Sequence, residues 1–171
     1  MRSFIGIKVP ENEKITSFQN ELKNRFRIKL VEAENLHITL KFLGEIDEKN
    51  LDKIIKALRM LEFEKFKVIM KGAGAFPKEN NARVIWIGLI SKELNDLGET
   101  VSTILKNYGD EKFSPHLTVG RLKTPENTIE VLSKYKNFEF GNIIVESFEI
   151  YKSTLTPQGP LYEEIEKFPG R

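Results

Sequence analysis

The chain of 171 residues contains no cysteine and only two histidines, His37 and His116. The absence of cysteine excludes a disulfide framework, a thiol nucleophile, a cysteine zinc site and an iron–sulfur cluster. Two histidines also exclude a three-histidine metal site. Long apolar runs are missing as well: the longest, over residues 84–90, is the length of a strand and cannot span a membrane. The apolar stretch at the N-terminus is too short for a signal peptide. We therefore expect a cytoplasmic protein without a membrane partner.

A large excess of charge of one sign is also absent. The chain has 27 basic and 25 acidic residues, a formal net charge of +2. This balance excludes a histone-like polyelectrolyte, but it leaves room for a local basic cleft that faces phosphate.

The hydrophobic pattern predicts helices and strands in alternation. Apolar residues at helical spacing predict helices near residues 15–26, 51–58, 94–105 and 129–135, with Asp47 and Ser91 as caps of the second and third. The glycine-broken stretch 71–81 is interpreted as a turn-rich connection near the cleft. Strands are predicted over residues 4–9, 36–43, 66–70, 83–89, 115–122, 143–146, 148–153 and 161–168.

The two halves of the sequence resemble each other when one is shifted by 79 residues (37 + 79 = 116). The shift places the tetrapeptide His37–Leu40 on the tetrapeptide His116–Val119. It also places the first predicted strand on the strand over residues 83–89. We therefore predict one domain over residues 1–171, with pseudo-repeat lobes of about 1–78 and 79–171 whose strands interweave. The predicted fold class is α+β: a bilobal pseudo-two-fold duplication with two antiparallel sheets flanking a central cleft and helices outside.

Both histidines lie in the same motif, H-x-T-x. Successive side chains of a strand alternate between its faces, so His37 and Thr39 point to one side, as do His116 and Thr118. Two lobes related by a pseudo-two-fold axis would bring these pairs face to face. Two imidazoles suit general acid–base attack on a phosphodiester, one as base and one as acid. Threonine hydroxyls can donate to the non-bridging oxygens.

Other interpretations of the motif are weaker. A single histidine beside a threonine on a strand is usually a packed or solvent-facing residue, but two copies at matching positions hold every histidine of the chain. A zinc site would need a carboxylate, and both H-x-T-x segments lack one; Glu34 and Glu45 flank only the first. We expect neither a metal ion nor another cofactor.

Two extended segments, ENLHITLKFLGE and FSPHLTVGRL, resemble the signature motifs of the two-histidine (2H) phosphoesterase superfamily. The chain is most similar to the RNA 2′,3′-cyclic phosphodiesterases of bacteria and archaea, also called 2′-5′ RNA ligases. The segments RSFIGIKVP, ARVIWIGL and STLTPQGPLYEEIEKFP extend this resemblance over nearly the whole length.

The resemblance implies roles for four residues. His37 would donate a proton to the departing ribose oxygen, and His116 would be the base that activates water. Thr39 and Thr118 would bind the phosphate. The product implied is RNA with a 2′-phosphate end; a 5′-hydroxyl in place of water would form a 2′-5′ linkage. The implied partner is RNA with a 2′,3′-cyclic phosphate end, such as tRNA halves, bound by a monomer.

Three more residues are candidates for substrate binding. In the family, the positions of Phe42 and Arg121 line the nucleotide pocket, where an aromatic face can stack on a base and a guanidinium can bind ribose or phosphate. Strand alternation places both on the face opposite the histidines, unless the strands bulge near Gly44 and Gly120. Alternation places Lys41 on the histidine face, where it could add positive charge.

Other segments have structural interpretations. Trp86 is interpreted as a core residue of a buried strand. The basic and aromatic run over residues 23–30 fits contact with an RNA backbone and an exposed helix end equally well. The alternative functions are a phosphodiesterase of small cyclic nucleotides or 2′-5′ oligoadenylates, and a non-catalytic module that binds RNA ends.

Overall fold

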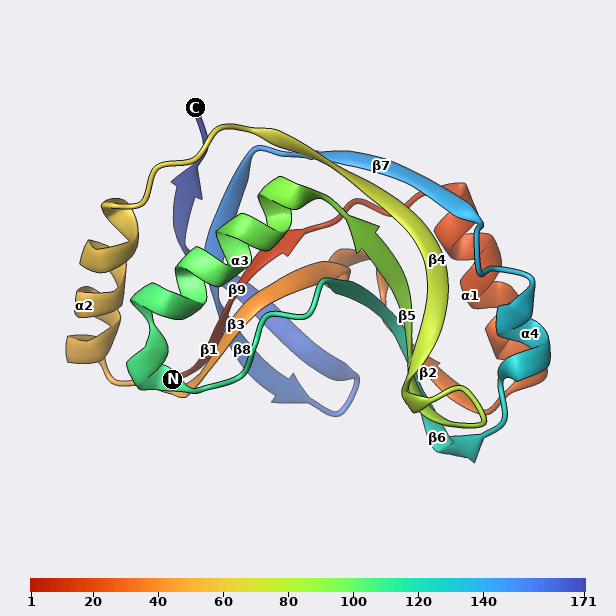
Figure 1. Cartoon of the computed structure of the whole chain (residues 1–171). Helices are drawn as coiled ribbons and strands as arrows, with labels where there is room; N and C mark the ends of the chain where they lie inside the picture. The colour runs from red at the N-terminus through yellow and green to blue at the C-terminus, as the bar shows by residue number, and fades with distance from the viewer.

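A computed structural model describes residues 1–171 as one curled antiparallel sheet of nine strands, with four α-helices packed around it (Figure 1). The α-helices are α1 (Glu13–Arg25), α2 (Glu48–Arg59), α3 (Lys92–Ile104) and α4 (Ile129–Ser133), and the short 3₁₀ helices are η1 (Ala33–Asn35) and η2 (Lys106–Tyr108). The strands are β1 (Arg2–Lys8), β2 (Ile28–Leu30), β3 (His37–Glu45), β4 (Phe66–Lys78), β5 (Asn81–Ile90), β6 (His116–Glu126), β7 (Glu139–Val145), β8 (Ser147–Thr156) and β9 (Gly159–Pro169).

The strand order in the sheet is β7-β4-β5-β6-β3-β1-β8-β9, with β2 beside β6. The α+β class with antiparallel pairing is confirmed. The two sheets predicted from the sequence are joined into one, because β3 and β6 pair at a single position, Ile38 opposite Leu117. Strand β8 pairs with β1, so the half of the sheet that holds β1 and β3 is completed by the last hairpin of the chain. The duplication itself remains a prediction.

Helix positions follow from their caps and apolar faces. The side chains of Asp47 and Ser91 accept hydrogen bonds from the third residue beyond them, which confirms the two predicted caps. Helix α1 begins after Asn12, which caps it in the same way. In Figure 1, α2 and α3 lie at one end of the molecule and α1 and α4 at the other. The Glu21–Lys134 ion pair, 2.8 Å long, joins α1 to the end of α4.

The stretch 71–81 is not the connection that its glycines suggested. Strand β4 continues to Lys78 and pairs with β5, and only residues 79–80 form the turn. Gly74 is needed in this strand because a Cβ there would lie 2.4 Å from the Trp86 ring. Gly72 has a φ of +80°, at an irregularity in the pairing. The glycines therefore serve close packing and a bulge within a strand.

Candidate active site

The two histidines occupy the first positions of neighbouring antiparallel strands. His37 opens β3 and His116 opens β6. The pairing of Ile38 with Leu117 sets the register, which places His37 beside Thr118 and Thr39 beside His116. Residues that face each other across an antiparallel pair point to the same side of the sheet. The four side chains of the two H-x-T-x motifs therefore lie together on one face.

Each imidazole is held by the backbone two residues before it. His37 Nδ1 lies 2.7 Å from the Asn35 carbonyl oxygen, and His116 Nδ1 lies 2.8 Å from the Ser114 carbonyl oxygen. A carbonyl oxygen only accepts, so each neutral ring carries its proton on Nδ1 and leaves Nε2 as the basic atom. The hydroxyl of Thr39 lies 3.0 Å from His37 Nε2 and donates to it in this state.

Burial lowers the pKa of both histidines, since it penalises the charged imidazolium. The carbonyl contacts at Nδ1 oppose this effect, and the positive charge of Arg121 lowers the pKa of both rings further. His116 also lowers the pKa of His37. In the absence of an anion both rings therefore favour the neutral form. A bound phosphate favours the protonated form and would raise both pKa values.

A β-bulge moves Phe42 onto the histidine face. Gly6 of β1 is opposite Thr39, but Phe4 is opposite Phe42, because Leu40 is an extra residue on β3. Phe4 and Gly6 point to the same side of β1, so their partners Thr39 and Phe42 do too. The Phe42 side chain is 59% exposed and available to a ligand.

The same bulge occurs on β6, where Val119 is the extra residue. Trp86 of β5 is opposite Thr118 and Val84 is opposite Arg121. Arg121 therefore shares the face of Thr118, and its positive charge adds to burial in lowering the pKa of both histidines. The structure brings Phe42 and Arg121 to the site on opposite sides of the histidine pair.

The placement predicted for Lys41 is wrong. The bulge that turns Phe42 toward the histidines turns Lys41 away from them, to the face of Ile5, its partner on β1. The Lys41 side chain is 2% exposed, and its Nζ donates to the Gly109 carbonyl oxygen at 2.7 Å. Glu111 lies 3.8 Å from the same nitrogen. Lys41 therefore anchors the segment after η2 and does not line the site.

Aromatic rings pack against both histidines. The ring of His37 lies 4.8 Å from Phe4 and 5.2 Å from Tyr162, centroid to centroid. The ring of His116 lies 5.2 Å from Phe76, edge to face. The sequence pattern did not indicate that these three rings lie beside the histidines. Phe4 could have been found from its place on β1, the strand that pairs with β3. Tyr162 reaches the site through the pairing of β9 with β8 and of β8 with β1, a long-range contact that no local sequence pattern predicts.

Trp86 is not a core residue as predicted. Its neighbours Ile85 and Ile87 are fully buried, but Trp86 itself is half-buried on the face of Thr118. Its ring lies 5.4 Å from Phe76. Together the two rings form an aromatic wall on the His116 side of the site.

Asn35 connects His37 to the last hairpin of the chain. Its carbonyl oxygen binds His37 Nδ1, and its side-chain amide donates to the Pro160 carbonyl oxygen at 3.1 Å. Pro160 lies two residues before Tyr162 on β9. The residue was visible in the sequence only as part of the segment before the histidine, where nothing distinguished it from a loop residue.

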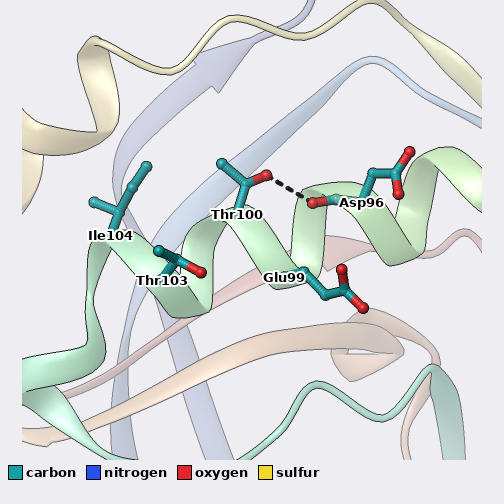
Figure 2. A pocket seen from close by; sticks show the side chains of 5 residues that line it. All are labelled: Asp96, Glu99, Thr100, Thr103 and Ile104. Carbon is teal, nitrogen blue, oxygen red and sulfur yellow. Dashed lines mark hydrogen bonds between the residues drawn. The ribbon is translucent and has the colours of Figure 1, made fainter.

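A separate hollow lies on the outer surface of α3 (Figure 2). Its lining comes only from this helix and includes the carboxylates of Asp96 and Glu99. The hydroxyl of Thr100 donates to the Asp96 carbonyl oxygen at 2.8 Å, an ordinary contact within a helix. The hollow includes neither histidine, and its two carboxylates would repel a phosphate.

Two kinds of feature are absent from the structure. No group of three or more His, Cys, Asp or Glu side chains is placed to hold a metal ion. None of the helices combines the length and the apolar character needed to cross a membrane.

Comparison with known proteins identifies the family. The family model described as LigT like Phosphoesterase matches residues 7–86 and 89–162. The chain is 43% identical to the RNA 2′,3′-cyclic phosphodiesterase of Methanocaldococcus jannaschii, over 98% of this chain and 100% of the relative. It is 39% identical to the protein of the same name from Archaeoglobus fulgidus, over 98% of this chain and 99% of the relative.

Solved structures share the fold over the whole chain. The crystal structure of TT0787 from Thermus thermophilus superposes with a TM-score of 0.83 at 28% identity, covering 99% of this chain and 97% of that one. E. coli LigT complexed with 3′-AMP superposes with a TM-score of 0.80 at 22% identity, covering 99% and 97%. With both H-x-T-x motifs placed on one face of the sheet, the chain belongs to the LigT-like phosphoesterases of the 2H superfamily.

Proposed function

We propose that this protein is an RNA 2′,3′-cyclic phosphodiesterase that opens a terminal cyclic phosphate to a 2′-phosphate by acid–base catalysis. The observation that carries the proposal is the geometry of the histidines. Two imidazoles, each with its Nδ1 bound to a carbonyl, lie on one sheet face with their threonines beside them. The names of full-length relatives at up to 43% identity support the substrate class.

The reaction needs one proton donor and one proton acceptor. His116 Nε2 takes a proton from water as the water oxygen forms a bond to phosphorus. The bond between phosphorus and the ribose 3′-oxygen breaks, and protonated His37 gives its Nε2 proton to that oxygen. One proton is taken up by His116 and one is given up by His37, so the number of protons is conserved. The product is a 2′-phosphate. Neither a metal ion nor a nucleotide takes part in this scheme.

The surroundings of the two rings support these roles. Two aromatic rings enclose His37, which shields a proton donor from water. His116 has one aromatic neighbour and is the less buried of the two rings, which leaves it more open to water. The hydroxyls of Thr39 and Thr118 and the guanidinium of Arg121 would hold the non-bridging oxygens. Phe42 would stack on the terminal base.

The substrate we propose is RNA with a 2′,3′-cyclic phosphate end, such as tRNA halves, acted on in the cytoplasm by a monomer. A 5′-hydroxyl that replaced water would reverse the chemistry and form a 2′-5′ linkage. Because water is the more abundant nucleophile, we expect hydrolysis to dominate.

The test is the opening of an oligonucleotide with a 2′,3′-cyclic phosphate end in the presence of EDTA, with the product isomer identified. The wild type should form a 2′-phosphate, and His37→Ala and His116→Ala should each lower kcat by a factor of about 100 to 10,000. Thermal unfolding of each variant would show that it is folded. A 3′-phosphate product would contradict the leaving group assigned here, and tight binding without turnover would indicate a module that only binds RNA ends. Turnover confined to small cyclic nucleotides or 2′-5′ oligoadenylates would contradict the substrate.

A further inference from the structure

Four cationic side chains lie on a two-stranded ladder that leads away from the histidines. Strand β2 pairs with β6 beyond the point where β3 leaves it, and Lys29 is opposite Arg121. The N–H of Lys123 donates to the Arg27 carbonyl oxygen at 2.9 Å, which extends the pairing by one more position. Figure 1 shows β2 and β6 together, far from α2. We call Arg27, Lys29, Arg121 and Lys123 the basic ladder.

The basic ladder lies on the same face of the sheet as the active site. Its members alternate with Ile28 and Leu122, which pack against or within the core, so the four cations point to the other side. Arg121 lies on the face of Thr118, because their partners on β5, Val84 and Trp86, point to the same side of that strand. All four residues are exposed, so a row of positive charges begins at Arg121, on the face of Thr118, and extends away from the histidines. We call this row the strip.

Within the protein these charges are almost without partners. Lys29 has one carboxylate near it, that of Glu32 at 3.9 Å, and no carboxylate lies within the ion-pair distance of 4.0 Å of Arg27, Arg121 or Lys123. Like charges directly opposite each other in a sheet are destabilising. The net charge of the whole chain is only +2, so this concentration is local. An anionic ligand along the strip would offset the repulsion.

We propose that the basic ladder binds the RNA backbone upstream of the cyclic phosphate. The inference rests on the proposed function, because that function places the 3′ end of the RNA at the histidines. A chain of phosphates that leaves the site along β6 passes Arg121 and then the other three cations. A path along β3 would instead lead to Glu45 at the end of that strand, whose carboxylate binds the N-terminal amine. Oligonucleotides are therefore the better substrates, and a mononucleotide gains nothing from the ladder.

The test uses a triple variant that leaves Arg121 in place. We would compare Arg27→Gln/Lys29→Gln/Lys123→Gln with a matched control, Lys49→Gln/Lys53→Gln/Lys56→Gln, which removes three exposed charges from α2. For each protein, kcat/KM is measured against salt on an oligonucleotide with a cyclic phosphate end and on a mononucleoside 2′,3′-cyclic phosphate.

Counterion release sets the size of the expected effect. Each phosphate contact to a single strand contributes about 0.7 to the log–log salt slope, so the ladder variant should lose about 2 from the slope on the oligonucleotide. A fourfold rise in salt then costs the wild type about 20-fold more than the variant. Activity on the mononucleotide should be unchanged, and the control should match the wild type on both substrates.

Binding of the same oligonucleotide, followed by fluorescence anisotropy, separates the two proposals. If the wild type opens neither substrate but the ladder variant binds the oligonucleotide with a smaller salt slope than the wild type, the ladder would be supported and the proposed reaction overturned. Hydrolysis with an unchanged slope in the ladder variant would support the reaction and overturn the ladder. An equal loss on the oligonucleotide and the mononucleotide would also overturn it.

Discussion

The two halves of the active site share a local design and differ in what surrounds it. His37 and His116 are each the first residue of a strand, and each has Nδ1 bound to the carbonyl oxygen two residues earlier. Each is followed by a bulge that turns the residue five positions after the histidine, Phe42 or Arg121, toward the site. The His37 half is closed by Phe4 and Tyr162, and its bulge turns Phe42 toward the site. The His116 half has Phe76 beside the ring, and its bulge turns a cation, Arg121, toward the site.

This difference indicates that the local backbone sets the geometry of each imidazole, whereas the surrounding side chains set its exposure to water. The carbonyl oxygens of Asn35 and Ser114, two residues before each histidine, set the same tautomer in both halves and leave Nε2 as the basic atom. This local arrangement cannot by itself decide which ring is acid and which is base. In the proposed reaction, the two aromatic rings beside His37 keep water from the proton donor, and the less enclosed His116 is open to it. The proposed roles therefore depend on strands that are distant in sequence.

The proposed difference in role between His37 and His116 is tested most directly by changing the leaving group. A substrate with sulfur in place of the bridging 3′-oxygen expels a thiolate, which leaves without a proton. With this substrate, His37→Ala should recover nearly all of its loss of about 100-fold or more in kcat, while His116→Ala should keep its loss. Rapid-quench product analysis would measure both rates. An equal recovery in the two variants would mean that the halves do not differ in role.

The hydrogen bond of Asn35 to the last hairpin offers a smaller test. Asn35→Ala removes the contact to Pro160 and should lower the free energy of unfolding by about 1 kcal/mol. Ser114→Ala is the matched change in the other half, where the side chain makes no hydrogen bond, and should be nearly neutral. Urea denaturation of both variants compares them. A loss in Ser114→Ala as large as that in Asn35→Ala would contradict this asymmetry.

The smallest effect concerns the charge that both halves share. Arg121→Gln removes a cation that disfavours both imidazolium ions, so the pKa of His37 and of His116 should rise and both titrations move to higher pH. The chain has only two histidines, which makes their NMR signals simple to follow without substrate. Lys49→Gln is a control in which neither should move. A shift confined to one ring would show that Arg121 serves only one half.

Strand alternation and the internal offset were sufficient to predict that the two His–Thr pairs lie together. Alternation pairs each histidine with its threonine, and the offset of 79 residues pairs the two motifs. Alternation then fails at Leu40 and Val119, where each bulge reverses the faces. Alternation alone put Lys41 on the histidine face, whereas Phe42 and Arg121 were named as pocket residues by the family resemblance and needed a bulge to reach that face. The sequence carries a trace of the bulges. The next core residues, Leu43 and Leu122, come three positions after Leu40 and Val119, an odd step that a regular strand does not make.

The second half of β4, beyond the predicted residues 66–70, and the whole of β2 were beyond what local sequence reveals. Glycines at 72 and 74 usually interrupt a strand, and their roles at a bulge and under an indole ring depend on tertiary contacts. Strand β2 has three residues and forms only because β3 leaves an edge of β6 unpaired. The sequence suggested for this segment a helix end or contact with RNA, and its pairing partner lies far along the chain.

The placement of β1 between β3 and β8 has a consequence for how the molecule folds. The first strand of the chain finds one partner early, but its other partner belongs to the final hairpin, whose Tyr162 packs on His37. Contacts between residues so far apart in sequence form slowly, because a large loop must close before they stabilise anything. Synthesis of the chain therefore yields a molecule in which His37 lacks its Tyr162 neighbour until the last strands emerge, so the proposed site is completed only at the end of folding.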